Sequence, residues 1–203
     1  MNTLYEGEWF DVIEVDDWHG IKPAGINVVV LPFERDAGGL PRAIGVMYEN
    51  NPLRPGAKST TLITGDAEGE DPDILAAAMR ELKEESGYSA GDPDRWYFLG
   101  FMTTSKLVAQ SHPCFAVDVT GIERKKPEGD GTKHEATSEF KMLPTKEALA
   151  TDDCFIPTLF LKMFTFIFGF GATNDNQESN NSTTTAKTEN NEPLQSQGTQ
   201  KDS

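Results

Sequence analysis

The chain has 203 residues, of which 37% are hydrophobic and 9% aromatic. This apolar content suffices for the core of one ordinary domain with appendages, or of two small domains at most. Aspartate and glutamate number 33 against 18 lysines and arginines, and the resulting net charge of −15 argues against bulk nucleic-acid binding. A small anionic substrate stays compatible with this charge, because carboxylates that hold divalent cations create a locally positive site.

Cysteine usage and the first residues both favour a cytoplasmic protein. The two cysteines, Cys114 and Cys154, lie far apart without a CxxC motif and indicate neither a disulfide framework nor a zinc site. The chain begins Met-Asn-Thr-Leu-Tyr-Glu-Gly-Glu, which is acidic and lacks the apolar run of a signal peptide.

The first third of the chain is predicted to form short strands. Residues 4–15 read as one or two strands around Gly7, and the β-branched run at residues 26–31 predicts a buried strand that Pro32 ends. Two further strands are predicted at residues 43–48 and 60–64, and residues 50–56, with two prolines, form the loop between them.

The clearest helix is predicted at residues 71–86. It opens on Asp71-Pro72-Asp73, where an aspartate can cap the first turn and the missing N–H of proline costs nothing. Gly87 is expected to end the helix in the left-handed conformation. The arc that must face the core holds Leu75, Ala78, Met79 and Leu82.

The later elements are strands at residues Trp96–Met102, 114–119 and 138–143, a short helix at residues 144–147 and a last helix at Phe155–Phe168. Only one substantial helix separates the early strands from the later ones. This order argues against a doubly wound sheet and for a mixed α/β domain.

The apolar residues 154–170 have two interpretations. We prefer a helix that is buried against the domain. The alternative is a segment that touches a membrane or docks a partner, although it is shorter than the roughly 20 residues that cross a bilayer and contains Pro157 and Lys162.

A change in composition near Gly171 predicts the end of the folded part. Residues 172–203 hold no aromatic side chain and one leucine, among many Asn, Thr, Ser, Gln and Glu. Such a segment cannot bury enough apolar area to offset its chain entropy. We therefore expect a domain at residues 1–170 and a disordered polar tail at residues 171–203.

Carboxylates gather on one edge of the predicted helix. At 100° per residue, Glu81, Glu84 and Glu85 fall within an arc of about 100° and repel one another. Lys83 lies on the far side, whereas Arg80 can reach Glu84 one turn later. Such a cluster suits magnesium, which takes carboxylate oxygens and keeps positions for water and substrate phosphates. The alternative is an acidic helix face that is merely solvated.

The spacing of these residues resembles a known motif. Residues 80–88 read Arg-Glu-Leu-Lys-Glu-Glu-Ser-Gly-Tyr and resemble the second half of the Nudix box, with Gly65 and the pair Gly69-Glu70 similar to its first half. The flanking segments look like the layout of ADP-ribose and nucleotide-sugar pyrophosphatases, so that the resemblance covers roughly residues 5–168. It implies a Nudix-like fold, with a mixed sheet between helices and a catalytic loop–helix–loop.

The first half of the box departs from the family spacing, which is Gly, five residues, Glu, seven residues, Arg. Here four residues separate Gly65 from Glu70, and nine separate Glu70 from Arg80. An extra half-turn at the start of the helix could absorb the difference. The role of Glu70, which in the family helps to secure the loop, is left open.

The resemblance implies a set of metal ligands. Glu81, Glu84 and Glu85 would bind Mg²⁺ or Mn²⁺ directly or through water, and the backbone carbonyl of Thr64 would be a further ligand. Arg80 would orient a carboxylate through a bidentate pair.

A general base often comes from a loop after the box in this family. Glu135 and Glu139 are the candidates here, and Glu135 is preferred because Glu139 falls at the start of the strand that follows. The expected catalytic residues are therefore Arg80, Glu84 and Glu135.

The implied reaction is hydrolysis of ADP-ribose or a related nucleotide sugar to a nucleoside monophosphate and a phosphorylated product. A catalytically weak nucleotide-sensing module is the alternative, motivated by the irregular first half of the box. Enzymes of this kind are often dimers, so a homodimer is also compatible with the resemblance. Trp9, Trp18 and Trp96 could stack on an adenine, but each is expected to pack in the core or in a dimer instead.

Overall fold

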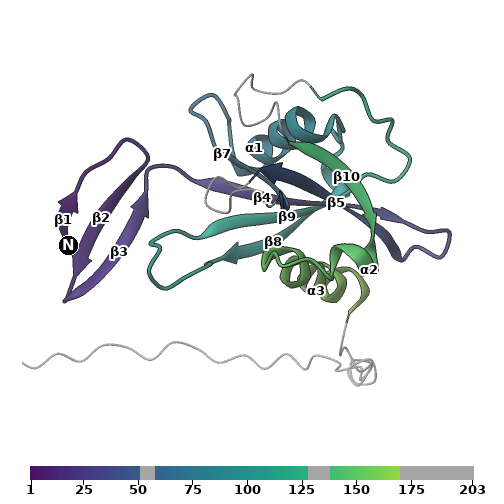
Figure 1. Ribbon diagram of the computed structural model, residues 1–203. Coiled ribbons are helices and arrows are strands. Elements are labelled where there is room, and N and C mark those ends of the chain that lie inside the picture. Colours follow the sequence, from purple (N-terminus) through teal and green to yellow (C-terminus); the bar gives the residue numbers. More distant parts are fainter. Residues whose placement is uncertain (51–57, 128–137, 170–203) are drawn as a thin grey trace, which may run out of the picture. The chain divides into compact units, whose positions relative to one another are not determined.

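Two β-sheets organise the computed structural model, which describes residues 1–50, 58–127 and 138–169 (Figure 1). The strands of the larger sheet run in the order β10-β5-β4-β9-β8, while β6 pairs with β5 and β7 pairs with β4. Their bounds are β4 Asn27–Arg35, β5 Pro41–Asn50, β6 Lys58–Thr61, β7 Ile63–Asp66, β8 Trp96–Met102, β9 His112–Asp118 and β10 Glu139–Pro144. The smaller sheet joins β1 Asn2–Tyr5, β2 Phe10–Val15 and β3 Trp18–Pro23 in antiparallel order.

The strand β4 forms the centre of the larger sheet. It pairs parallel with β9 and antiparallel with β5 and β7, so the sheet is mixed, as predicted. Residues 28–30 are fully buried, as expected for a β-branched run that is covered on both faces. The prediction that Pro32 ends this strand is wrong. The strand continues to Arg35 because pairing beyond the proline, such as that of Phe33 with Ile44, outweighs one missing N–H.

Helices cover both faces of the larger sheet (Figure 1). They are α1 Ile74–Glu81, the π-helical turn η1 Leu82–Ser86 that continues it, the 3₁₀ turn η2 Pro93–Arg95, α2 Thr145–Ala148 and α3 Phe155–Phe168. Val28 and Val30 of β4 pack in the core under α1, whereas Val29 and Leu31 pack in the core under α2 and α3. The alternation of side chains along one strand therefore supplies both cores.

Two predictions for the strands need correction. The strand expected at residues 60–64 is divided into β6, which pairs with β5, and β7, which pairs with β4. The division falls at Leu62, whose side chain enters the α3-side core while that of Ile63 enters the α1-side core. The sequence did not predict β3, because its residues are mostly exposed and carry no apolar periodicity.

The smaller sheet is joined to the segment between β8 and β9 by backbone hydrogen bonds of β3. The Ile21 amide donates to the Leu107 carbonyl at 2.7 Å, and the Ala109 amide donates to the Ile21 carbonyl at 2.7 Å. Trp9 and Trp18 of this sheet region are 73% and 58% exposed, so neither belongs to a core within the chain.

The last helix has the predicted bounds and a buried face. Ile156, Leu159 and Met163 have no exposed surface and pack under the larger sheet. Among the described residues, no helix is long and apolar enough to cross a membrane. The packing supports the first interpretation of this segment, a core helix. The predicted tail at residues 171–203 lies outside the described residues.

Two leucines of α3 test this assignment. Leu159→Ala should lower the free energy of unfolding by about 2–5 kcal/mol, because a cavity replaces a fully buried side chain. Leu161→Ala should change it by less than about 0.5 kcal/mol, since Leu161 is 61% exposed. Urea unfolding of both variants measures the difference, and equal losses would contradict a core role for α3.

Candidate active site

The helix that carries the three glutamates, formed by α1 and η1 and here called the acid helix, begins later than predicted. Asp73, rather than Asp71, caps it, and its carboxylate accepts the Ala76 amide at 2.8 Å. Asp71 instead accepts hydrogen bonds from the Glu68 amide at 2.9 Å and from the Arg80 guanidinium. Gly87 ends the helix at φ 78°, as predicted.

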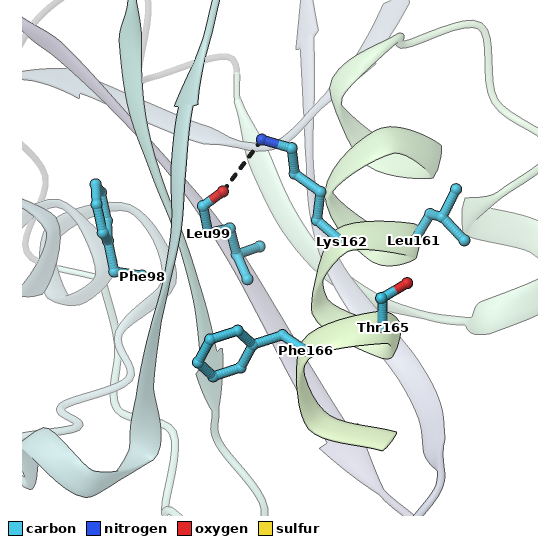
Figure 2. Close-up of a pocket in the computed structure, with 6 residues that line it drawn as sticks. All are labelled: Phe98, Leu99, Leu161, Lys162, Thr165 and Phe166. Atoms are coloured by element: carbon cyan, nitrogen blue, oxygen red, sulfur yellow. Dashed lines mark hydrogen bonds between the residues drawn. The ribbon is translucent and has the colours of Figure 1, made fainter. Parts of the chain in front are cut away.

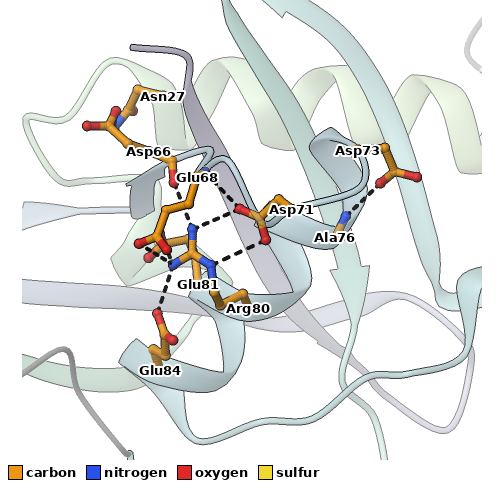
Figure 3. Close-up of polar contacts among 9 residues, drawn as sticks. All are labelled: Asn27, Asp66, Glu68, Asp71, Asp73, Ala76, Arg80, Glu81 and Glu84. Carbon is orange, nitrogen blue, oxygen red and sulfur yellow. Dashed lines mark hydrogen bonds and ion pairs between the residues drawn. The ribbon is translucent and has the colours of Figure 1, made fainter. Parts of the chain in front are cut away.

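Arg80 is the centre of the polar cluster on this helix (Figure 3). Its Nη1 donates to Glu81 Oε1 at 2.8 Å and to Glu84 Oε2 at 3.0 Å. Its Nη2 donates to Asp71 Oδ2 at 3.1 Å and to the Asp66 carbonyl at 2.7 Å. One guanidinium thus ties the loop before the helix to two of the three carboxylates of the predicted site.

Burial and charge oppose each other in this cluster. Burial raises the pKa of Glu81 to about 7, although the charge and hydrogen bond of Arg80 lower it. Partial burial lowers the pKa of Arg80, but its hydrogen bond to Asp71 and the neighbouring glutamates raise it further above its ordinary value. The Glu81 carboxylate therefore lies where added positive charge would stabilise it.

Asp71, rather than Glu70, is the loop acid that contacts Arg80. Glu70 is exposed, whereas the Asp71 side chain is 11% exposed and pairs with Arg80. Five residues separate Gly65 from Asp71, and eight separate Asp71 from Arg80. Counted this way, the loop keeps the family spacing and the helix N-terminus carries one additional residue. The irregularity expected at Glu70 is thus smaller than the sequence comparison indicated.

A π-helical turn carries the second and third glutamates. The Ser86 hydroxyl donates to the Leu82 carbonyl, which an α-helix would pair with the Ser86 amide. Glu84 and Glu85 lie in this turn and are half-buried, while Lys83 is exposed, as predicted. Such turns hold one more residue than an α-helical turn and are frequent at functional sites. A regular spacing of 100° per residue therefore describes the helix only as far as Glu81.

The contact between Gly65 and Glu81 brings the expected backbone ligand and the first glutamate together. A Cβ atom at Gly65 would lie 1.9 Å from Glu81 Cδ, so the carboxyl group occupies the space that any other residue would fill. The carbonyl of Thr64 is part of the peptide group that joins Thr64 to Gly65, next to this contact. Carboxylate and carbonyl oxygens form the hard donor set that magnesium prefers, so the residues present fit the predicted ion.

In the described part of the chain, no three His, Cys, Asp or Glu side chains converge closely enough to hold a metal ion by themselves. The guanidinium of Arg80 bonds one oxygen of Glu81 and one of Glu84, so a cation of the protein already brings these two carboxylates to one place.

The two base candidates differ in what the structure shows. Glu135 lies outside the described residues. Glu139 is the first residue of β10 and forms an exposed ion pair with Lys141 at 2.8 Å. The hydrogen bond from Lys141 keeps the pKa of Glu139 below its usual value. A carboxylate paired in this way is a weaker base, so Glu135 stays the preferred prediction.

A cavity of about 440 Å³ lies on the other side of the sheet, between β8 and α3 (Figure 2). Its lining is apolar except for Thr165 and Lys162, and Lys162 Nζ donates to the Leu99 carbonyl at 3.1 Å. No carboxylate lines it. This cavity therefore does not coincide with the acid helix, which covers the opposite face of the sheet.

The tryptophans separate into two groups. Trp96 is buried, its Nε1 donates to the Ala90 carbonyl at 2.8 Å, and its ring packs edge-on against Phe115. Core packing is thus confirmed for Trp96. Trp18 is exposed, with Lys106 Nζ 4.9 Å from its ring centroid.

Comparison with known proteins identifies the architecture. No protein-family model matches the sequence, and no curated protein matches it. A structure described as an ADP compounds hydrolase is 14% identical, with a TM-score of 0.59 over 83% of this chain and 91% of that one. The NUDIX domain of NrtR from Shewanella oneidensis, solved with ADP ribose, is 12% identical, with a TM-score of 0.52 over 68% of this chain and 84% of that one.

The chain has the Nudix fold. A structure from Listeria monocytogenes that is described as a NUDIX hydrolase shows a weaker likeness, on which the fold assignment does not rest, at 20% identity and a TM-score of 0.49 over 68% of this chain and 90% of that one. The predicted mixed sheet between helices is confirmed, and within this Nudix fold Arg80 and its carboxylates occupy the loop–helix that follows β7.

The role of Asp71 can be separated from that of Glu70. Asp71→Asn should lower the free energy of unfolding at neutral pH by about 1–3 kcal/mol, because the ion pair with Arg80 is lost and a neutral amide oxygen is a weaker acceptor than a carboxylate. Glu70→Gln removes the same charge from an exposed position and should cost less than about 0.5 kcal/mol.

The pH dependence of the same variants gives a second measurement. The hydrogen bond from Arg80 lowers the pKa of folded Asp71, so its contribution is present above the unfolded pKa and is lost as the pH falls through the folded one. Urea unfolding at several acidic pH values should show that the free energy of unfolding falls less on acidification in Asp71→Asn than in the wild type. Equal stabilities of the two variants would contradict the assignment.

The contact at Gly65 gives another test. Gly65→Ala should displace the Glu81 carboxyl, because the new methyl group would overlap it. The unfolding free energy should fall by about 1–3 kcal/mol at most, since only the end of a flexible side chain must move, but Mn²⁺ affinity should fall at least about tenfold. Gly69→Ala, with no atom within 4 Å of its Cβ position, is the matched control. Mn²⁺ titration followed by electron paramagnetic resonance measures both, and unchanged affinity in Gly65→Ala would refute the expected ligand set.

Proposed function

We propose that this protein is a metal-dependent pyrophosphohydrolase. Its substrate would be a nucleoside diphosphate linked to another moiety, with ADP-ribose or a nucleotide sugar favoured. The products would be a nucleoside monophosphate and a phosphorylated compound. The observation that carries the proposal is the Arg80 cluster, which gathers Glu81 and Glu84 beside Gly65 in a Nudix fold.

Glu81, Glu84, Glu85 and the Thr64 carbonyl would hold Mg²⁺, or Mn²⁺ in its place. When bound, such ions polarise the phosphorus and lower the pKa of a coordinated water. Bound cations would also reduce the electrostatic repulsion between a diphosphate and a protein whose net charge is −15.

The residues of the chain would mainly position the reacting groups. Arg80 holds the carboxylate ends of Glu81 and Glu84 in one place before any ligand arrives, which reduces the reorganisation needed at binding. Its contacts with Asp71 and the Asp66 carbonyl fix the loop that carries Gly65 relative to the helix. Glu135, in the proposed role of general base, would take the proton of the attacking water.

The substrate class is supported by two structural neighbours. One is described as a hydrolase of ADP compounds, and the other holds ADP ribose. This chain covers 91% of the first neighbour and 84% of the second, so the likeness extends over most of each neighbour rather than over the helix alone. ADP-ribose is therefore the first compound to assay.

A nucleotide-sensing module that does not turn over its ligand is the second candidate. It is favoured by the absence, among the described residues, of side chains that already converge on an ion position. The additional residue between Asp71 and Arg80 points the same way. Against it stands the retention of Glu81, Glu84 and Glu85 on one helix.

Turnover of a substrate panel separates the two candidates. The wild type should release AMP from ADP-ribose in the presence of Mg²⁺ and lose this activity on chelation. Glu85→Gln should reduce kcat/KM by more than about 100-fold, because even the loss of an outer-shell partner of a metal costs 10–100-fold. Glu70→Gln, which removes one exposed carboxylate of the same charge, should retain the activity. Tight ADP-ribose binding without turnover of any compound would favour the sensor.

A further inference from the structure

A segment after β9 crosses the end of the acid helix. The Arg124 Nε donates to the Ser86 carbonyl at 2.7 Å, and the Lys125 amide donates to the Gly87 carbonyl at 3.0 Å. A Cβ atom at Gly87 would lie 2.0 Å from the Lys125 carbonyl oxygen, so only a glycine permits this approach of two backbones. Residues 119–127, here called the strap, are therefore fixed to the last turn of the helix.

Arg124 also reaches the sheet. Its Cζ lies 4.9 Å from the ring centroid of Phe140 in β10, a distance typical of a cation–π contact. The Phe140 ring packs edge-on against Tyr88, which follows the helix, with centroids 5.9 Å apart. One side chain thus links the helix end to β10 by two different kinds of contact.

A positive charge at the end of η1 is electrostatically favourable. Glu84 and Glu85 lie in the last turn, where the partial negative charge of the helix terminus disfavours carboxylates. Arg80 contacts the turn from its N-terminal side, through Glu84. At the C-terminal side of the turn, Arg124 donates to the Ser86 carbonyl. This bond satisfies a carbonyl that the helix leaves unpaired and places a positive charge at the negative end of the helix dipole.

We propose that Arg124 is a positioning residue for the proposed reaction: it holds the turn that bears Glu84 and Glu85 at a fixed place against β10. The inference rests on the proposed function for its kinetic consequence. Its structural content, the fixing of the carboxylate turn, also affects cation affinity and can be measured without turnover.

The chain offers a matched control in Arg95. Its Nη1 donates to the carbonyls of Asp118 and Thr120, at 3.1 and 3.0 Å, so it binds the end of β9 and the beginning of the strap as Arg124 binds the helix end. Both arginines thus serve backbone carbonyls, but these two bonds of Arg95 do not involve the acid helix. Because the side chain of Arg124 is exposed, Arg124→Gln leaves no cavity and should fold.

The experiment compares Arg124→Gln, Arg124→Lys and Arg95→Gln in the full chain, with circular dichroism to verify folding. Hydrolysis of ADP-ribose with Mg²⁺ should show kcat reduced about 10- to 100-fold in Arg124→Gln, because a displacement near 1 Å can cost 100-fold, with KM changed little. Arg124→Lys keeps the charge and should recover part of the loss. Arg95→Gln should stay near the wild type.

Mn²⁺ affinity provides the readout that is independent of turnover. Arg124→Gln should bind Mn²⁺ about tenfold more weakly than Arg95→Gln, in line with the loss of an outer-shell partner. If the wild type hydrolyses nothing, the proposed function fails, and this affinity difference alone decides the role of Arg124. Equal Mn²⁺ affinities, or equal kcat values where turnover exists, in Arg124→Gln and Arg95→Gln would overturn the inference.

Discussion

The guanidinium of Arg80 organises this molecule's polar face. It bonds Asp71 and the Asp66 carbonyl on the loop and Glu81 and Glu84 on the helix, so that loop and helix keep one relative position. Without it, several carboxylates would be partly buried close to one another, an arrangement that like-charge repulsion and desolvation both disfavour. The planar fork of arginine suits this role, because a lysine ammonium could not serve four acceptors in fixed directions.

The sheet determines where that cluster stands. Three adjoining buried valines of β4 pack alternately into the two cores. The strand β7, which pairs with β4, places Gly65 against Glu81 of the helix. The close approach of Gly65 to Glu81 then holds a carboxyl group against backbone. On the far face, α3 closes the second core and borders an apolar cavity that shares no residue with the acid helix. The polar cluster and the apolar cavity thus lie on opposite faces of one sheet, and each face has its own core.

The two ends of the acid helix are stabilised by different means. Asp73 caps the start, where a carboxylate and the helix dipole agree. At the other end Glu84 and Glu85 oppose the dipole, and the strap compensates with the guanidinium of Arg124 and the amide of Lys125. Burial raises the pKa of Glu81, the residue before this turn, so a nearby positive charge stabilises its carboxylate.

Local pattern in the sequence determined the elements whose signals are contained in a few neighbouring residues. The acid helix, its end at Gly87, the face carrying Glu81, and the bounds of β8 and α3 follow from periodicity and capping. Only the tertiary structure decided that β4 passes through Pro32, that residues 60–64 divide between two neighbours, and that Asp71 rather than Glu70 pairs with Arg80. Each of these depends on partners distant in the chain, whose pairing energy overrides the local preference of one residue. The contact of Arg124 with Ser86 spans 38 positions and has no local signature at all.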